Sequence, residues 1–563
     1  MRQLNRVNQY ARVWQQSAGE MQHLSVGELA ACCYCSERHA RSLLRLWQQS
    51  QWVEWLAEPG RGKRGKLRFL TSPDALRRQL IRQHLDLGQP HSAMQLSQLD
   101  PEQLTHLLQP LMGGHWQNDA PTLRIPYYRP LENWHPLQLT GRAEQHMAMQ
   151  VFSGLTRFNQ QRVEGDLAHH WHISEDGVMW DFYLRPQLFW HNGEQVLGEQ
   201  LLQGLHQLLN DKLAHPLFAS VQSITLPHPA CLRFQLSKPD YWLASRLASV
   251  PALLPHPENA TQGCGPWQLA RFEPELVRLE SHPRYHLQHP LMQALEYWIT
   301  PSLFAPELGT SCRHPVQIAI GQAEELPQLR PVEESVSLGF CYLAIQHHRL
   351  TPLQALSIMS LIHRNALISH LDVDEGLITP SSHVLPGWAS PVWSAIEEAV
   401  LPAKLTLYYH LPVELHAMAN SLKQTLLEQG CELTLCFHPQ KSWRGCDGLS
   451  EADLVMGDRL IGEAPEYTLE SWLRSDTLWT AMLSPRRYSH LQHSLDTIQN
   501  EPLEERRFSA LAETYLALMQ GGHLMPLFNY RYQVSAPPGV QGIHLNARGW
   551  FDFSRAWIPP PLG

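Results

Sequence analysis

The segment SERHARSLLRLW, residues 36–47, has the pattern of a helix with one apolar face and one basic face. Ser36 can cap its N-terminus, and Ala40, Leu43, Leu44 and Trp47 recur at the spacing that buries one side of a helix. A polar opposite face of this kind suits the major groove of DNA. We expect DNA contacts from Ser36, Arg38, His39, Arg41, Ser42 and Arg45. Arg38 and Arg41 could bind guanine edges, whereas Arg45 is better placed for a phosphate.

A basic, glycine-rich hairpin follows in WVEWLAEPGRGKRGKLRFL, residues 52–70. Apolar residues at 52–56 and 67–70 predict two short strands, and Pro59 with three glycines predicts a flexible tip between them. Basic side chains on such a tip neutralise phosphates. The residues expected to do so are Arg61, Lys63, Arg64, Lys66 and Arg68.

Two further helices precede residue 36. Val7, Tyr10, Ala11 and Trp14 follow helical spacing, and the capping box of Ser25 and Glu28 predicts the start of a second helix. Three helices followed by a basic hairpin predict a winged helix-turn-helix over residues 1–71.

Charge is divided unevenly along the chain. Residues 1–85 hold 14 Lys and Arg against 6 Asp and Glu, a net charge of +8, whereas the remainder holds 30 against 47, a net charge of −17. This division predicts that the two parts meet different partners, with nucleic acid on the basic side.

Length and composition describe a multidomain globular protein. The 563 residues are 43% hydrophobic and include 19 Trp, which excludes a disordered tail, a collagen or a coiled coil. No run approaches the roughly 20 apolar residues that span a bilayer, and the opening MRQLNRVNQYARVWQQ lacks the apolar core of a signal peptide. We expect a cytoplasmic protein without membrane contact, whose 10 Cys stay reduced.

The rest of the chain predicts a linker and two lobes. Residues 72–119 read as a helical linker, with one helix after Ser72 or Asp74 and another that begins at Asp100-Pro101 and stops at Gly113-Gly114. After residue 120 strands and helices alternate, which predicts α/β lobes with mixed sheets and a ligand cleft between them. We divide this body into a first lobe at 120–335, a second lobe at 336–520 and a C-terminal return to the first lobe at 521–563.

Several blocks of the body resemble the bacterial solute-binding proteins of family 5, the oligopeptide- and dipeptide-binding type. Asp166, Ala168 and Trp171 match an acid–x–Ala–x–x–Trp block, and the FWHNG at 189–193 matches the turn that follows it. The GCGPW at 263–267 matches a Gly-x-Gly-Pro-aromatic turn, with Cys264 in place of the usual Thr. The resemblance implies a two-lobed, periplasmic-binding-protein-like fold.

A family 5 body behind a winged helix resembles the SgrR-type transcriptional regulators over nearly the whole chain. The resemblance implies a cytoplasmic regulator that senses a small ligand, either a sugar phosphate or a peptide. It further implies that the regulator activates a small-RNA gene in sugar-phosphate stress and represses its own gene. The implied partners are double-stranded promoter DNA and the small molecule, with RNA polymerase as a further candidate.

The resemblance also points to candidate ligand residues in the cleft. They combine aromatic walls with an arginine that could bind a carboxylate or phosphate through two hydrogen bonds. In the first lobe they are Arg157, Trp190, His191 and Trp267, and in the second lobe Tyr342, Trp388 and Asp458.

Catalytic and metal-binding motifs are not found in the sequence. Gly60 to Lys66 matches G-x-x-x-x-G-K, but Leu67 stands where Ser or Thr would bind magnesium, and a strand follows instead of a helix. Cys32, Cys33 and Cys35 contain a C-x-x-C without a second ligand pair at zinc-finger spacing. We therefore predict no catalytic residue, metal or cofactor. The alternative to a regulator is a non-exported solute or oligopeptide receptor of the ABC-transporter type, without a gene-regulatory role.

Overall fold

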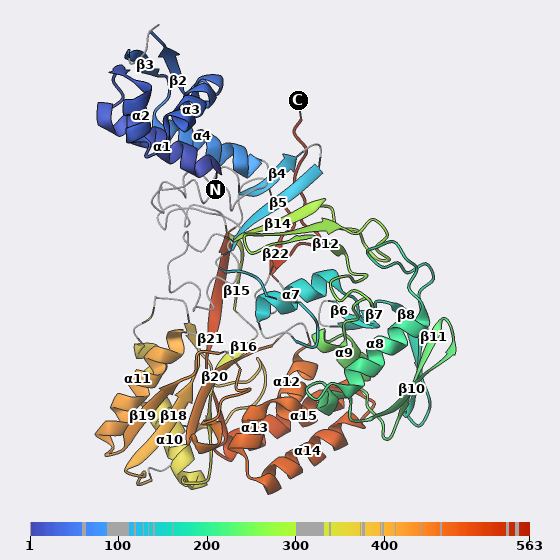
Figure 1. Cartoon of the computed structure of the whole chain (residues 1–563). Coiled ribbons are helices and arrows are strands. Elements are labelled where there is room, and N and C mark those ends of the chain that lie inside the picture. The colour runs from blue at the N-terminus through green and yellow to red at the C-terminus, as the bar shows by residue number, and fades with distance from the viewer. Residues whose placement is uncertain are drawn as a thin grey trace.

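The computed structural model shows an N-terminal module set above two lobes (Figure 1). It describes residues 2–58, 63–86, 112–117, 120–127, 129–132, 134–138, 141–159, 162–299, 331–336, 339–371, 373, 378–393, 396, 399–410, 413–440, 442–461, 464–535, 540–545 and 551–562.

The N-terminal module is the expected winged helix-turn-helix. Its strands form one sheet in the order β1-β3-β2, and Ser25 and Glu28 form the predicted capping box at the start of its second helix. A short first strand, which the sequence pattern did not predict, pairs with β3. The elements are α1 (Arg2–Ser17), β1 (Gln22–Leu24), α2 (Val26–Cys32), α3 (Glu37–Gln49), β2 (Val53–Leu56) and β3 (Gly65–Phe69).

The apolar residues predicted for this module do form its core. Tyr10 and Trp47 are almost fully buried, and their rings meet edge to face at 5.5 Å between centroids. Leu43 and Leu67 are buried beside them, so helix α3 and the hairpin share one core. This packing leaves the polar side of α3 in solvent.

The linker differs from its prediction at its C-terminal end. The helix α4 (Pro73–Asp86) is present, and Ser72 caps it by accepting a hydrogen bond from the Ala75 amide at 3.2 Å. The second predicted linker helix lies largely outside the described residues. Gly113 and Gly114, expected to follow that helix, begin the strand β4 (Gly113–Gln117), which lies within the predicted linker and pairs with β5.

Tertiary packing explains this strand. A Cβ atom at Gly114 would lie 2.8 Å from side-chain atoms of Val540 and Ile558, so the close approach of the C-terminal segment requires glycine there.

The first lobe contains two sheets, with strand orders β12-β13-β14-β5-β4 and β10-β11-β9-β8, and a separate hairpin of β6 and β7. Helix α7 packs against the first sheet and α8 against the second. The elements are β5 (Ala120–Tyr127), α7 (Arg142–Val151), β6 (Thr156–Asn159), β7 (Arg162–Gly165), β8 (Ala168–Ile173), β9 (Met179–Leu184), α8 (Gly198–Asn210), β10 (Val221–His228), β11 (Cys231–Leu236), α9 (Leu243–Leu247), β12 (Trp267–Phe272), β13 (Leu276–Ser281) and β14 (Ala294–Ile299).

The second lobe is built on a mixed sheet in the order β15-β21-β16-β20-β18-β19, with β17 paired to β21. Helices α12 to α15 form a layer on the side that faces the first lobe (Figure 1). The elements are β15 (Pro331–Val336), β16 (Gly339–Ile345), α10 (Pro352–Arg364), β17 (Ile378–Pro380), β18 (Lys404–Tyr409), α11 (Val413–Glu428), β19 (Glu432–Phe437), β20 (Leu454–Leu460), α12 (Pro465–Ser475), α13 (Thr477–Met482), α14 (Pro485–Gln499), α15 (Glu504–Gln520) and β21 (Leu524–Ser535).

The chain returns to the first lobe after β21. Residues Val540, Ile543, Phe553 and Ile558 join the core that includes Leu123 and Ile125 of β5. The strands β22 (His544–Leu545) and β23 (Phe551–Asp552) pair with each other in this segment. Because β21 itself belongs to the second-lobe sheet, the return to the first lobe follows residue 535.

The N-terminal module is docked on the first lobe through α4. Leu76, Leu80 and Ile81 of α4 share one buried cluster with the core of the module and with Leu276 and Trp298 of the first-lobe sheet. Within the described residues, no helix is both long and apolar enough to cross a membrane.

Candidate functional site

The recognition-helix candidates lie together on the solvent side of α3. Ser36, Arg38, His39, Arg41, Ser42 and Arg45 are all exposed. Ser36 caps the helix by accepting a hydrogen bond from the His39 amide at 3.3 Å, and the Ser42 hydroxyl donates to the Arg38 carbonyl at 3.2 Å. Arg41 pairs with Glu37 one turn earlier at 3.0 Å, while Arg38 and Arg45 make no ion pair with any described residue. Two guanidinium groups therefore project from α3 toward solvent.

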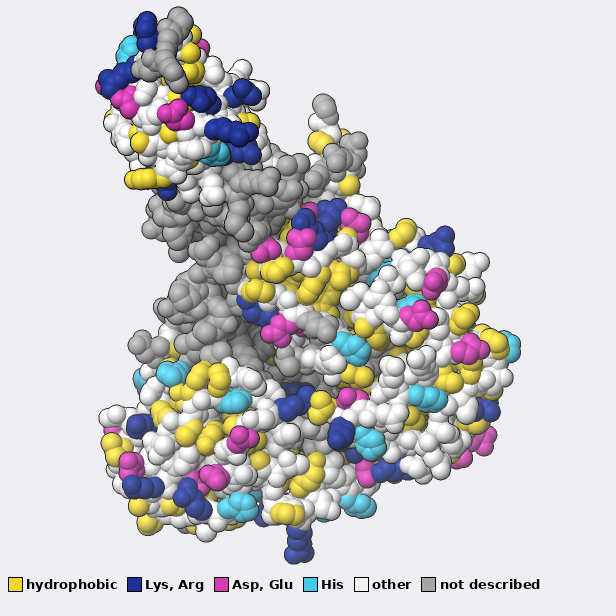
Figure 2. Space-filling view, viewed as in Figure 1, with side chains coloured by type: hydrophobic (Ala, Val, Ile, Leu, Met, Phe, Trp, Pro, Cys, Tyr) yellow, Lys and Arg dark blue, Asp and Glu magenta, His cyan; other side chains and the backbone are white. Residues whose placement is uncertain are grey.

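The hairpin adds further cations beside this helix. Lys63, Arg64, Lys66 and Arg68 are exposed, and Arg61 lies outside the described residues. Arg64 pairs with Glu28 at the start of α2, and Arg68 pairs with Glu54 at 3.4 Å. The amide of Ser25 and the Arg64 guanidinium together lower the pKa of Glu28. Figure 2 shows the dark blue basic side chains on the N-terminal module.

The turn that leads into α3 carries an unusual residue. Tyr34 has a φ of +51°, in the left-handed region that glycine adopts at least cost, and 84% of its surface is exposed. The guanidinium of Arg12 lies 5.1 Å from the centre of its ring. A large aromatic side chain is thus held in solvent two residues before the cap of α3.

A glycine should fit this turn better than an alanine. At position 34 we expect Tyr34→Gly to be more stable than Tyr34→Ala by about 1 kcal/mol, because only alanine keeps the left-handed strain. Thermal unfolding of the two purified variants measures the difference. An alanine variant as stable as the glycine variant would show that the turn is unstrained.

The first-lobe ligand candidates are held mainly by protein contacts. Arg157 on β6 donates through Nε to Glu164 on the paired strand β7 at 2.7 Å. Trp190 and Trp267 have no exposed surface, and the Trp190 indole donates to Gln200 at 2.9 Å. Their ligand role remains a prediction that these contacts do not test.

His191 holds the glycine turn that the sequence pattern singled out. Its Nδ1 accepts a hydrogen bond from the Gly263 amide at 3.2 Å, so its other nitrogen, Nε2, carries the proton and donates to the Gly265 carbonyl at 3.1 Å. Burial lowers the pKa of His191 to about 3. The hydrogen bond to the Gly265 carbonyl partly opposes this effect, and His282 adds a small further lowering of the pKa. Both ring nitrogens are therefore occupied by the backbone.

The second-lobe candidates lie on neighbouring strands and a loop. Tyr342 on β16 faces Gly457 on β20, one residue before Asp458, and its hydroxyl accepts a hydrogen bond from the Trp443 indole at 2.8 Å. Asp458 lies 4.0 Å from Nδ1 of His410. Trp388 is nearly buried against Phe508 and Tyr515. Tyr342 and Asp458 thus lie on adjacent strands, with Asp458 opposite Cys341 in the register, whereas Trp388 packs with the α15 helix.

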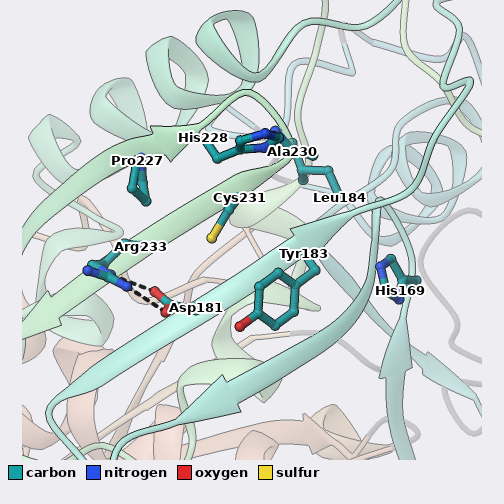
Figure 3. Close-up of a pocket in the computed structure, with 9 residues that line it drawn as sticks. All are labelled: His169, Asp181, Tyr183, Leu184, Pro227, His228, Ala230, Cys231 and Arg233. Carbon is teal, nitrogen blue, oxygen red and sulfur yellow. Dashed lines mark hydrogen bonds and ion pairs between the residues drawn. The ribbon is translucent and has the colours of Figure 1, made fainter.

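A surface pocket of about 570 Å³ lies elsewhere, on the outer face of β9 and β11 (Figure 3). Arg233 and Asp181 face each other there through two hydrogen bonds of 2.7 and 2.8 Å, and this arginine is the main cause of the lowered pKa of Asp181. In the sequence, the only signal for this pocket is the alternation along both strands, which places these side chains on one face. Its lining residues are His169, Asp181, Tyr183, Leu184, Pro227, His228, Ala230, Cys231 and Arg233.

The described residues hold no group of three or more His, Cys, Asp or Glu arranged to bind a metal ion. In the C-x-x-C segment, Cys33 is buried in the core of the module, and burial raises the pKa of its thiol to about 12. The Cys33 thiol is therefore protonated at neutral pH and acts as a small apolar side chain.

Solved structures share the fold of the two lobes. The body is similar to NikA from Brucella suis in complex with Fe(III)-EDTA, with a TM-score of 0.64 and 17% identity, covering 78% of this chain and 100% of that one. It is also similar to a dipeptide binding protein from Pseudoalteromonas sp. SM9913 in complex with Met-Leu, with a TM-score of 0.62, 16% identity and coverage of 77% and 100%. The fold thus defines a class of protein in which a winged-helix module precedes a solute-binding-protein body.

Sequence comparisons then identify the family. Residues 5–119 match the family "Sugar transport-related sRNA regulator N-term", and residues 162–303 match "Bacterial extracellular solute-binding proteins, family 5 Middle". The chain is 56% identical to a protein of Escherichia coli (strain K12) named "Uncharacterized protein YbaE", over 100% of both chains. It is 30% identical to the HTH-type transcriptional regulator SgrR of Yersinia enterocolitica over 98% of both chains. The chain belongs to the SgrR family of HTH-type regulators.

Proposed function

We propose that the protein is a ligand-sensing transcriptional regulator that binds double-stranded promoter DNA through α3 and the hairpin. The observation that carries this proposal is the row of exposed cations on these two elements, with Arg38 and Arg45 unpaired among the described residues. Phosphate neutralisation by such a surface supplies affinity, and side chains of a recognition helix supply base preference. The protein would act in the cytoplasm, where promoter DNA lies, and would not be an enzyme.

The ligand would bind between the two lobes. Solved structures of the same fold hold a dipeptide in one case and Fe(III)-EDTA in another, and both ligands carry carboxylates. Arg157, Tyr342 and Asp458 are the polar candidates for such a ligand here, beside the aromatic residues Trp190, His191, Trp267 and Trp388. A sugar phosphate or a peptide remains the proposed ligand class. The proposed targets are a small-RNA gene, in keeping with the name of the family that the N-terminal residues match, and the protein's own gene.

The full-length protein provides the test of DNA binding. Genomic fragments retained by the purified chain at moderate salt would be sequenced, and we expect enrichment of a few promoters that include its own. Equal retention of every fragment, or retention of none, would contradict a regulator and favour the receptor alternative.

The hairpin should contribute affinity without base preference. Replacing Arg61, Lys63 and Arg64 by alanine should weaken binding to all DNA and flatten the dependence of log Kd on log salt by about 0.9 per lost phosphate contact. Fluorescence anisotropy at several salt concentrations, on a retained promoter and on an unrelated duplex, measures both effects. An unchanged salt slope would show that the hairpin does not contact the phosphates of the DNA.

A further inference from the structure

Two segments that are far apart in the sequence meet through buried charges. Residues 238–246 of the first lobe, which end in α9, lie against α12 and α14 of the second lobe. Arg246 has no exposed surface, and its guanidinium donates to both carboxylate oxygens of Glu470 on α12, at 3.0 and 3.2 Å. Gln499 at the end of α14 accepts from the same guanidinium at 3.3 Å.

Each lobe also supplies a counter-ion of its own. In the first lobe, Asp240 accepts from Nε of Arg246 at 3.0 Å. In the second lobe, Arg474 donates to Glu470 one turn earlier on α12. Burial alone would raise the pKa of Glu470, but Arg246 and Arg474 together hold it below its ordinary value, so the carboxylate is charged. We call Asp240, Arg246, Glu470, Arg474 and Gln499 the inter-lobe cluster.

This arrangement allows the lobes to separate without stranding a bare charge. Breaking a buried ion pair is costly chiefly because the remaining charge loses its partner. Here Arg246 would keep Asp240, and Glu470 would keep Arg474. Arg474 has a further partner in Asp496, at 2.9 Å. Loss of the contact between the lobes would therefore leave no member of the cluster without a counter-ion, unlike the loss of a buried pair with one anion and one cation.

Other contacts around the cluster also join the two lobes. The Tyr241 amide donates to the Gln499 carbonyl at 3.0 Å, and the Gln499 side chain donates to the Pro239 carbonyl at 3.2 Å. The Trp242 indole donates to Glu466 on α12 at 2.6 Å. These contacts lie apart from the strands β15 and β21, which pair where the chain runs toward the first lobe (Figure 1).

We propose that the inter-lobe cluster is a reversible latch that holds the two lobes closed in the absence of a ligand. Because a ligand enters the space between the lobes only from the open form, the strength of the latch sets the population that can take up a ligand. This inference concerns the body of the protein and holds whether or not the N-terminal module binds DNA.

Hydrogen exchange of the full-length, ligand-free protein tests the latch. Glu470→Gln removes the charge and replaces one of the two acceptor oxygens by an amide donor that faces a guanidinium group. We expect the peptide that contains the Tyr241 amide to exchange about tenfold faster in this variant, the effect of losing a charged hydrogen-bond pair. The matched control is Glu432→Gln, which removes an exposed carboxylate paired with Lys404 on the second-lobe sheet. The radius of gyration from small-angle X-ray scattering should rise in Glu470→Gln and not in the control.

Two results would overturn the latch. Exchange at Tyr241 within twofold of the control would show that Glu470 does not hold the lobes together. Equal acceleration of the peptides of α12 and α14 would show that Glu470 only stabilises its own lobe. If Glu470→Gln does not fold, Gln499→Ala serves instead, since it removes the side-chain hydrogen bonds to Arg246 and Pro239 without changing charge, and a smaller acceleration at Tyr241 is expected.

Discussion

Lowering the pH from 7 to 5 is expected to remove about 5 kcal/mol from the free energy of unfolding of the two lobes. Burial lowers the pKa of His191 and His523 to about 3 and that of His282 to about 4. In the unfolded chain these histidines titrate near 6.5. Their stabilising effect is therefore fully present above pH 6.5 and is lost as the pH falls toward 4, because only the unfolded chain takes up the protons.

The free energy of unfolding should depend steeply on pH. Each histidine contributes about 1.4 kcal/mol per pH unit below 6, and three contribute roughly 4 kcal/mol per unit. For His523 two neighbours add to the effect of burial on the pKa, since its ring stacks on that of His347 at 3.9 Å and its Nε2 lies 3.0 Å from the Arg487 guanidinium. A proton on His523 would face one cation and a second histidine inside the second lobe.

Urea unfolding followed by tryptophan fluorescence between pH 7.5 and 4.5 measures this slope. His523→Gln should reduce it by about one third, whatever its effect on stability at pH 7. The exposed His493, replaced by glutamine, is the matched control and should leave the slope unchanged. A free energy of unfolding that stays constant between pH 6.5 and 4.5 would contradict the neutral, buried state of these rings.

Replacing Arg38, Arg41 and Arg45 together by alanine is expected to lower the affinity for a retained promoter at least about a hundredfold, because a base contact contributes about 1–3 kcal/mol and each phosphate contact adds salt-dependent affinity. The fold should persist, since the three side chains are exposed and the Arg41–Glu37 pair on the helix surface stabilises by only about 0.5 kcal/mol. The affinity for unrelated DNA should fall less.

The control for this triple variant has the same change in net charge but leaves α3 intact. Arg444, Arg486 and Arg506 are exposed on the second lobe, and their replacement by alanine removes the same three charges away from the module. Anisotropy titrations on promoter and unrelated duplexes compare the two variants. An equal loss of affinity in both would mean that overall charge, rather than the face of α3, binds the DNA.

Local signals made the helices of the N-terminal module predictable. Ser25 with Glu28 and Ser36 act on amides within three residues, so the caps are visible in a short stretch of sequence. The strand β1 was missed because Gln22–Leu24 is too short to show alternation and forms only by pairing with β3. The strand that begins at Gly113 was not predicted for a related reason, since it depends on the C-terminal segment that packs against Gly114.

The sequence by itself determined the winged-helix module, the basic face of α3 and the family of the body, because caps, helical spacing and motif blocks are properties of neighbouring residues. Only the tertiary structure decided which polar groups have partners. His191 binds the backbone of a turn more than 70 residues away, and Arg246 binds Glu470 at a separation of 224 residues. The sequence shows which side chains carry a charge or a ring nitrogen. The partner of each such group depends on which distant segment folding brings beside it, and that partner sets the pKa and the role of the group.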